Sequence, residues 1–175
     1  DTIADRAKAN KRMIYHYFTG KDDLFRAVLA DAYEDIRSAE RRLDLQAMEP
    51  EDAIRRLVEF TFDYYLKNPE FLTLVNSENL HKGKHLKTSP DVRAMQQGHV
   101  GIVEDILARG VRKGVFRAGV DPVQLAVTIA AIGYYYLTNR FTGEILFKRD
   151  FMSEASLDER FAFNLDTVLR LVSRP

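Results

Sequence analysis

The chain has 175 residues, of which 46% are hydrophobic and 30% are charged, a composition typical of a globular protein. Its 26 lysines and arginines balance its 26 aspartates and glutamates, which excludes a protein that binds nucleic acid through net charge alone. The sequence contains no cysteine, which excludes a disulfide framework, a thiolate metal site and a cysteine nucleophile.

No signal peptide is visible at the start of the sequence. The most apolar run, from Leu125 to Leu137, is shorter than the roughly 20 residues that a helix needs to cross a bilayer. Together with the lack of cysteine, these features predict a cytoplasmic protein without a membrane partner.

A short aromatic and basic segment begins at Asn10 and ends at Phe18. Asn10 is a favourable N-cap, because its side-chain oxygen can accept a hydrogen bond from a free backbone N–H of the first turn. At helical spacing Ile14 and Phe18 share one face, whereas Arg12 and His16 point the opposite way. The segment therefore predicts a recognition helix that is buried on one side and presents the other side to the major groove of DNA.

The surroundings of this segment support a helix-turn-helix. Residues 3–7 carry small and apolar side chains suited to close packing against a second helix, and Thr19 and Gly20 interrupt the helical pattern. Residues 1–21 contain five lysines and arginines against two aspartates. This local positive charge is enough to attract phosphate, with a strength that depends on salt.

The run Ile3-Ala4-x-x-Ala7-x-x-Asn10-x-x-x-Ile14-Tyr15-His16-Tyr17-Phe18-x-x-Lys21-x-x-Leu24 resembles the DNA-binding signature of the TetR/AcrR family of bacterial transcription regulators. The positions match in order and without a gap. One departure is Lys8, which stands where the family often has a glycine in the turn and where another residue can strain the backbone. Asp1 falls inside the second helix of the family fold, so we expect the sequence to be a fragment that lacks the first helix.

The resemblance implies that the residues on the outer side of the recognition helix and at its edges bind DNA. The expected contacts are Thr2, Asn10, Lys11, Arg12, Met13, Tyr15, His16, Tyr17 and Lys21. Arg12 is the best candidate for a guanine, because its planar fork fits O6 and N7 together. The tyrosines, Thr2 and Lys21 are expected near backbone phosphates. The alternatives are a core position for Tyr17 and an ordinary surface lysine for Lys21.

Beyond residue 20 the sequence predicts helices and no strands, because apolar residues recur at helical spacing after proline or capping residues. The predicted helices cover residues 21–43, 50–67, 70–80, 90 to 110 or 114, 122–147 and 156–172. Ser156 and Glu159 have the spacing of a capping box. The fold is predicted to be all-α, with a helix-turn-helix domain over residues 1–28 and an effector-binding and dimerisation domain over residues 29–175.

The last two predicted helices carry more apolar surface than one core should need, and such surface is rarely left open. In the family these helices pair with those of a second copy in a four-helix bundle, so the resemblance implies a homodimer. The expected interface residues are Leu125, Ile129, Ile132, Tyr136, Phe161, Leu165, Val168, Leu169 and Val172. The alternative is a thick core within one chain.

The resemblance also implies a small effector, often apolar or aromatic, held among the middle helices. Aromatic walls with a few polar groups are typical of such pockets. The candidates are Phe62, Tyr65, Phe71, Asn76, Glu78, Asn79, Tyr134, Tyr135, Asn139 and Arg140. The alternative for each aromatic residue is a place in the core. Effector binding would shift the population toward a form whose recognition helices are wrongly spaced for DNA.

These features predict a ligand-released repressor that binds a near-palindromic double-stranded operator as a homodimer and needs no cofactor. Glu78, His81 and His85 have the spacing of a helical metal site, but Gly83 and the offer of only two nitrogens argue against it. No nucleophile elbow, phosphate-binding glycine loop or paired-carboxylate motif indicates an enzyme.

The remaining alternative is a TetR-like helical protein that has lost operator binding and acts through protein or small-molecule contacts. The intact segment from Tyr15 to Phe18, together with Lys21, argues against that alternative.

Overall fold

The computed structural model describes residues 2–174, apart from the side chains of Thr2 and Lys11. The DNA contacts predicted for these two side chains lie outside the described residues. The elements are α1 (Thr2–Arg6), α2 (Lys11–Tyr17), α3 (Lys21–Arg41), α4 (Pro50–Lys67), α5 (Pro69–Leu80), η1 (Leu86–Thr88), α6 (Pro90–Arg112), α7 (Pro122–Thr138), α8 (Arg140–Phe147) and α9 (Glu154–Val172). Within residues 2–174 there are helices and one isolated bridge between Phe116 and Ser173 but no strand, which confirms the predicted all-α fold.

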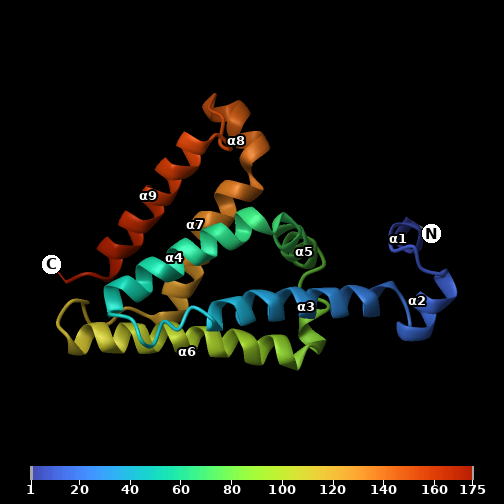
Figure 1. Cartoon of the computed structure of the whole chain (residues 1–175), viewed down its shortest axis with the longest axis horizontal. Coiled ribbons are helices and arrows are strands. Elements are labelled where there is room, and N and C mark those ends of the chain that lie inside the picture. The colour runs from blue at the N-terminus through green and yellow to red at the C-terminus, as the bar shows by residue number, and fades with distance from the viewer. Residues whose placement is uncertain (1, 175) are drawn as a thin grey trace.

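The long helix α3 joins a small N-terminal head to the rest of the molecule. Figure 1 shows α1 and α2 at one end of α3, away from the other helices, while the remainder of α3 runs beside α6. Helix α4 contacts α6, α7 and α9, and α7 contacts α6 and α9. Among the described residues, no helix is both long and apolar enough to cross a membrane.

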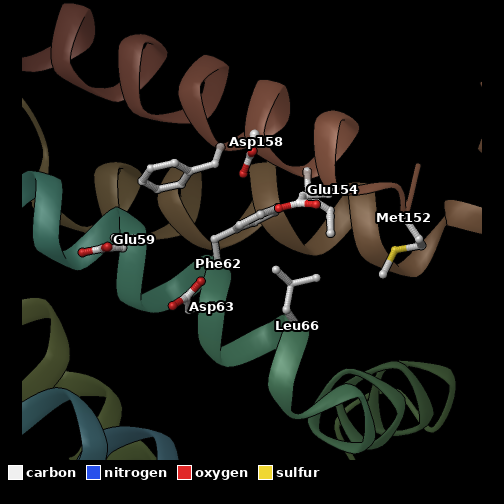
Figure 2. A pocket seen from close by; sticks show the side chains of 9 residues that line it. Glu59, Phe62, Asp63, Leu66, Met152, Glu154 and Asp158 are labelled. Atoms are coloured by element: carbon white, nitrogen blue, oxygen red, sulfur yellow. The ribbon is translucent and has the colours of Figure 1, made fainter. Parts of the chain in front are cut away.

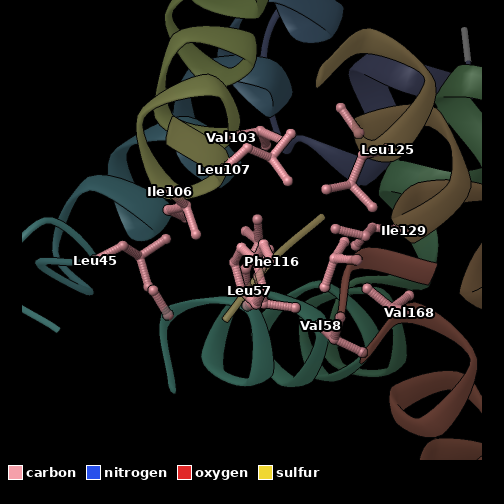
Figure 3. Close-up of a cluster of buried hydrophobic side chains, with 14 residues drawn as sticks. Leu45, Leu57, Val58, Val103, Ile106, Leu107, Phe116, Leu125, Ile129 and Val168 are labelled. Atoms are coloured by element: carbon pink, nitrogen blue, oxygen red, sulfur yellow. The ribbon is translucent and has the colours of Figure 1, made fainter. Parts of the chain in front are cut away.

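The core forms around α4, whose apolar residues surround much of the helix. Leu57 and Val58 are almost fully buried and meet side chains from α6, α7 and α9 (Figure 3). Each such aliphatic side chain stabilises the fold by roughly 1.5–3 kcal/mol. Phe116, from the connection between α6 and α7, fills the same core next to Gly110. A Cβ at Gly110 would lie 1.9 Å from the Phe116 ring, so this contact requires glycine.

Two predicted helix boundaries are wrong. The helix predicted over residues 122–147 is interrupted at Asn139, whose side-chain amide donates to the carbonyl of Tyr135 at 3.0 Å and so satisfies the end of α7. The last helix begins at Glu154, because Ser153 is the N-cap and its hydroxyl accepts from the N–H of Ser156 at 3.3 Å. The predicted capping box of Ser156 and Glu159 therefore does not form.

The predicted dimer interface is largely the interior of a single chain. Less than a tenth of each of Leu125, Ile129, Tyr136, Val168 and Val172 is exposed, so a partner cannot reach these side chains. The other four residues are partly buried and pack against the core: Ile132, Phe161, Leu165 and Leu169. The physical reason is that α7 is apolar nearly all round, so its periodicity does not distinguish the core face from the outer face.

Candidate DNA-binding surface and ligand pockets

The head has the geometry of a helix-turn-helix. After α1, Lys8 adopts a left-handed conformation with φ of 51°, the strain expected where the turn lacks a glycine. The N–H of Ala9 donates back to the carbonyl of Ala4 at 3.0 Å, which closes the turn. Asn10 caps α2 as predicted, because its side-chain oxygen accepts from the N–H of Arg12 at 2.9 Å.

Helix α2 presents a cationic and aromatic face to solvent. Arg12 and His16 are exposed, whereas Ile14 and Phe18 are partly buried on the other side, as the helical spacing predicts. Half or more of the surface of Met13, Tyr15 and Tyr17 is also exposed, at 50%, 57% and 68%. The alternative of a core position for Tyr17 is therefore wrong. The exposed side chains of α2 are free to meet base edges and phosphates.

The start of α3 carries the last residue predicted to contact DNA. Thr19 donates through its backbone N–H to Oδ2 of Asp23 at 3.1 Å, which fixes the connection between α2 and α3. Lys21 lies in the first turn of α3 and is exposed. The connection between α5 and α6 is called here the loop 81–89. The residue after Lys21, Asp22, contacts this loop.

This contact between α3 and the loop 81–89 was not predicted. Lys84 donates to the carboxylate of Asp22 and, as the main cause, holds the pKa of that carboxyl below its ordinary value. Nε2 of His85 lies 3.5 Å from Asp22, and the His85 ring packs 4.7 Å from the ring of Phe25. The only signals in the sequence are a basic loop and an acidic helix start, which do not identify partners so far apart along the chain.

Glu78 holds the loop 81–89 against α5. Its carboxylate accepts from the N–H groups of His85 at 2.8 Å and Leu86 at 3.0 Å and lies 2.6 Å from Nδ1 of His85. Glu78 is almost fully buried, so it serves as an internal anchor and not as the predicted effector contact. His81 is directed elsewhere, with Nδ1 2.7 Å from the carbonyl of Ser77. In the described part of the chain, no cluster of three or more histidine, aspartate or glutamate side chains is arranged to hold a metal ion.

A second buried network joins α3 to α6. Arg37 donates to Oε2 of Glu40 at 2.6 Å, and Nδ1 of His99 on α6 lies 2.9 Å from Oε1 of the same carboxylate. All three side chains are buried. Helix α3, which carries the head, is therefore fastened to the body both near its start and near its end.

The ten residues predicted to bind an effector are divided among the core, the helix ends and the surface. Tyr65 and Phe71 stack at 5.9 Å in a buried aromatic cluster, which also contains Phe62 and is contacted by Tyr134. Tyr134 donates to the side chain of Asn76. The side chains of Asn79, Asn139 and Arg140 bond to backbone carbonyls at nearby helix ends. Tyr135 is 65% exposed.

One opening lies between α4 and α9 and has a volume of about 410 Å³. We call it the α4–α9 groove; its lining residues are Glu59, Phe62, Asp63, Leu66, Met152, Glu154, Leu157, Asp158 and Phe161. Figure 2 shows Phe62 and Leu66 extending from α4 into the space below α9, with carboxylates on both helices. Glu59 is bonded to Arg56 at 2.7 Å and Asp63 to Lys67 at 3.3 Å, so these two carboxylates already have cationic partners.

A second opening, of about 460 Å³, lies where α7, α8 and α9 meet. We call it the aromatic pocket; its lining residues are Tyr135, Tyr136, Phe147, Arg149, Phe151, Ser156, Glu159, Arg160 and Phe163. Of the residues predicted to bind an effector, it contains Tyr135. The sequence does not predict the other residues of its wall, because it does not indicate that the chain after α8 returns so that Phe151 stacks on Tyr136.

Comparisons with known proteins agree with this geometry. Residues 1–28 match the family described as bacterial regulatory proteins of the tetR family, and residues 50–168 match the family described as tetracyclin repressor-like, C-terminal domain. The HTH-type transcriptional repressor NicS of Pseudomonas putida is 37% identical over 174 residues, which is 99% of this chain and 82% of that protein.

Solved structures support the same fold. A bacterial regulatory protein of the tetR family from Rhodococcus aligns with a TM-score of 0.74 at 18% identity, over 99% of this chain and 85% of that one. A transcriptional regulator from Streptomyces coelicolor aligns with a TM-score of 0.70 at 20% identity, over 99% and 86%. The two family matches and the repressor relative agree with the helix-turn-helix head and the exposed face of α2. The chain therefore belongs to the TetR family of bacterial regulatory proteins and is a DNA-binding transcriptional regulator.

Proposed function

We propose that this regulator represses transcription by binding a near-palindromic operator as a homodimer, and that a small molecule releases it. It acts in the cytoplasm, through binding and not through catalysis. The observation that carries the proposal is the exposed face of α2, where Arg12, Tyr15 and His16 lie together on a capped helix at the tip of the molecule.

The side chains of α2 suit the two tasks of DNA recognition. Arg12 offers the planar pair of donors that fits a guanine edge, and His16, one turn further along, lies on the same side of the helix. Tyr15 and Tyr17 offer hydroxyls at the margins, where backbone phosphates lie in such complexes. Lys21, in the first turn of α3, adds positive charge beside them.

An exposed apolar surface supports the dimer. Val123, Val127 and Tyr135 lie along the outer side of α7 and are 48%, 56% and 65% exposed. The next helix, α8, exposes further apolar side chains, and Phe141, Ile145, Leu146 and Phe147 are each more than 60% exposed. A surface of this kind is usually covered by a partner. A two-fold dimer would place two copies of α2 to read half-sites about 34–36 Å apart.

The contacts of α3 support a route from the body to the head. The loop 81–89 holds its start through Asp22 and Phe25, and the network of Glu40 and His99 holds its far half. Any change in the body that tilts α3 must therefore move α2. An effector that binds the tilted form more tightly would release DNA in proportion to its difference in affinity for the two forms.

Selection of genomic DNA fragments by the full-length protein tests this proposal. Enrichment of a short near-palindrome would support it, and binding to that fragment can then be measured by fluorescence anisotropy. Arg12→Ala should weaken binding, whereas Arg55→Ala, which removes an exposed arginine from α4 in the body, should not. Failure to enrich any sequence would instead favour a protein of this fold that no longer binds operators.

A further inference from the structure

The wall of the aromatic pocket is a stack of flat rings. Tyr136 and Phe151 lie 4.5 Å apart at an angle of 5°, and Phe147 lies 6.1 Å from Phe151 at 18°. The hydroxyl of Tyr136 donates to the carbonyl of Phe151 at 3.0 Å, which fixes the orientation of its ring. Gly143 allows this arrangement, because a Cβ there would lie 2.6 Å from the Phe151 ring. The pocket therefore offers a preformed, planar apolar surface.

Arg160 brings a cation into this wall. Its guanidinium carbon lies 5.3 Å from the ring centre of Tyr136 and 5.5 Å from that of Phe163. One terminal nitrogen donates to the carbonyl of Ile132 at 3.1 Å, but the Nε atom is buried and has no acceptor among residues 2–174. Burial lowers the pKa of Arg160 from its ordinary value. A partly buried cation is costly unless an anion lies close to it.

The other arginine of the aromatic pocket differs from Arg160, because its donors have acceptors. Arg149, also in the aromatic pocket, donates to Glu159 and lies 3.2 Å from the hydroxyl of Ser156. Within the described part of the chain, no carboxylate lies within ion-pair distance of Arg160. The chemistry of the aromatic pocket is thus a flat ring surface next to an uncompensated cation.

We propose that the aromatic pocket binds a small planar aromatic carboxylate, with its ring against the stacked wall and its carboxylate on Arg160. The volume of about 460 Å³ is within the range of small-molecule sites. Because Arg160 lines the pocket, a carboxylate there would accept from its outer guanidinium nitrogens in charge-assisted hydrogen bonds, which are stronger than neutral ones. The proposal rests on the proposed function, since it names the class of the effector.

The mouth of the pocket lies on the face proposed for dimerisation. Tyr135, Phe147 and Phe163 surround it and are 65%, 68% and 64% exposed. A partner subunit on this face would cover the bound molecule, so ligand binding and the spacing of the two heads would be linked. The competing occupant is a side chain of the partner itself, which would leave no room for a ligand.

Calorimetric titration of the full-length protein tests the proposal with benzoate and 1-naphthoate as probes. Benzamide and benzylamine are the matched neutral and cationic compounds, and hexanoate is the aliphatic carboxylate. Benzoate or naphthoate should bind about tenfold or more tightly than benzamide, benzylamine or hexanoate. This difference is the expected effect of one hydrogen bond between charged groups, made by a ligand whose ring also packs on the aromatic wall. Equal binding of benzoate and benzamide, or no binding of any carboxylate, would overturn the proposal.

Variants locate the site. Arg160→Met should reduce naphthoate affinity about tenfold or more, whereas Arg170→Met, which removes an exposed arginine from the same helix, should leave it unchanged. Phe163→Ala removes an exposed ring and should also weaken binding without disturbing the fold. Unchanged affinity in both Arg160→Met and Phe163→Ala would overturn the assignment.

Operator binding is measured separately, by anisotropy without ligand. If the wild-type protein binds its operator but no carboxylate, this inference fails and the regulator remains. If it binds carboxylates but no DNA, the pocket stands and the proposed function fails.

Discussion

The ring of His85 lies 4.7 Å from the ring of Phe25, which joins the loop after α5 to the helix that carries the DNA-binding head. His85 is held there by Glu78 on its other side, and Lys84 completes the contact through Asp22. The head is therefore connected to the body by a specific set of side chains as well as by the continuous helix α3. The behaviour of Glu78 provides a direct test of this connection.

Glu78→Gln should destabilise the protein in a pH-dependent way. Burial raises the pKa of Glu78, but hydrogen bonds from the N–H of Leu86 and from the ring and N–H of His85 outweigh it, so the pKa lies below its ordinary 4.5. The ionised form therefore stabilises the fold above about pH 4.5, and this contribution is lost as the pH falls through the lower, folded-state pKa. Urea unfolding followed by circular dichroism should show a loss of about 1–3 kcal/mol at neutral pH.

The difference between wild type and Glu78→Gln should then narrow as the pH falls below about 4.5. Glu104→Gln, at an exposed position on α6, is the control and should change the free energy of unfolding little at any pH. A Glu78→Gln difference that stays constant with pH would contradict the role given to the carboxylate.

Alanine in place of three glycines of α6 should change the stability of the protein in opposite directions. Gly110→Ala should cost about 1–3 kcal/mol or more, because the new methyl group would overlap the buried ring of Phe116. Gly98→Ala and Gly101→Ala add a methyl group in open space on the same helix and should stabilise it by about 0.5–1 kcal/mol each. Chemical unfolding distinguishes the signs. Equal effects at all three positions would mean that Phe116 does not pack as described.

A charge on the outer apolar surface should separate the subunits. Ile145 is 77% exposed in the single chain, so Ile145→Asp should leave the circular dichroism spectrum unchanged while placing an uncompensated carboxylate in the proposed interface. Light scattering at micromolar concentration should report a monomer. Leu80→Asp, at an 84% exposed position at the end of α5, is the control and should remain a dimer. A dimeric Ile145→Asp protein would place the interface elsewhere.

Much of the fold could be predicted because its signals are local. Pro50, Pro90 and Pro122 each lie in the first turn of the helix they were predicted to begin, and Asn10 caps α2. The strain at Lys8 was also predicted, since a turn that favours glycine carries a lysine. Such features depend on residues a few positions apart.

What could not be predicted depends on contacts between distant segments. Helix α7 is apolar all round, so the sequence does not reveal that Ile129 faces the core while Val127 faces outward. Nor does it indicate that the chain breaks at Asn139 and folds back so that Phe151 stacks on Tyr136. The aromatic pocket arises from that fold-back and has no local signature.

The most direct test of the account is the affinity of Arg12→Ala for its selected operator and for random DNA of the same length, beside Arg55→Ala. If Arg12 reads a base, its loss should cost about 1–3 kcal/mol on the operator and clearly less on random DNA, and Arg55→Ala should match the wild type on both. An equal loss on operator and random DNA, or no loss at all, would contradict the claim that the outer face of α2 recognises sequence.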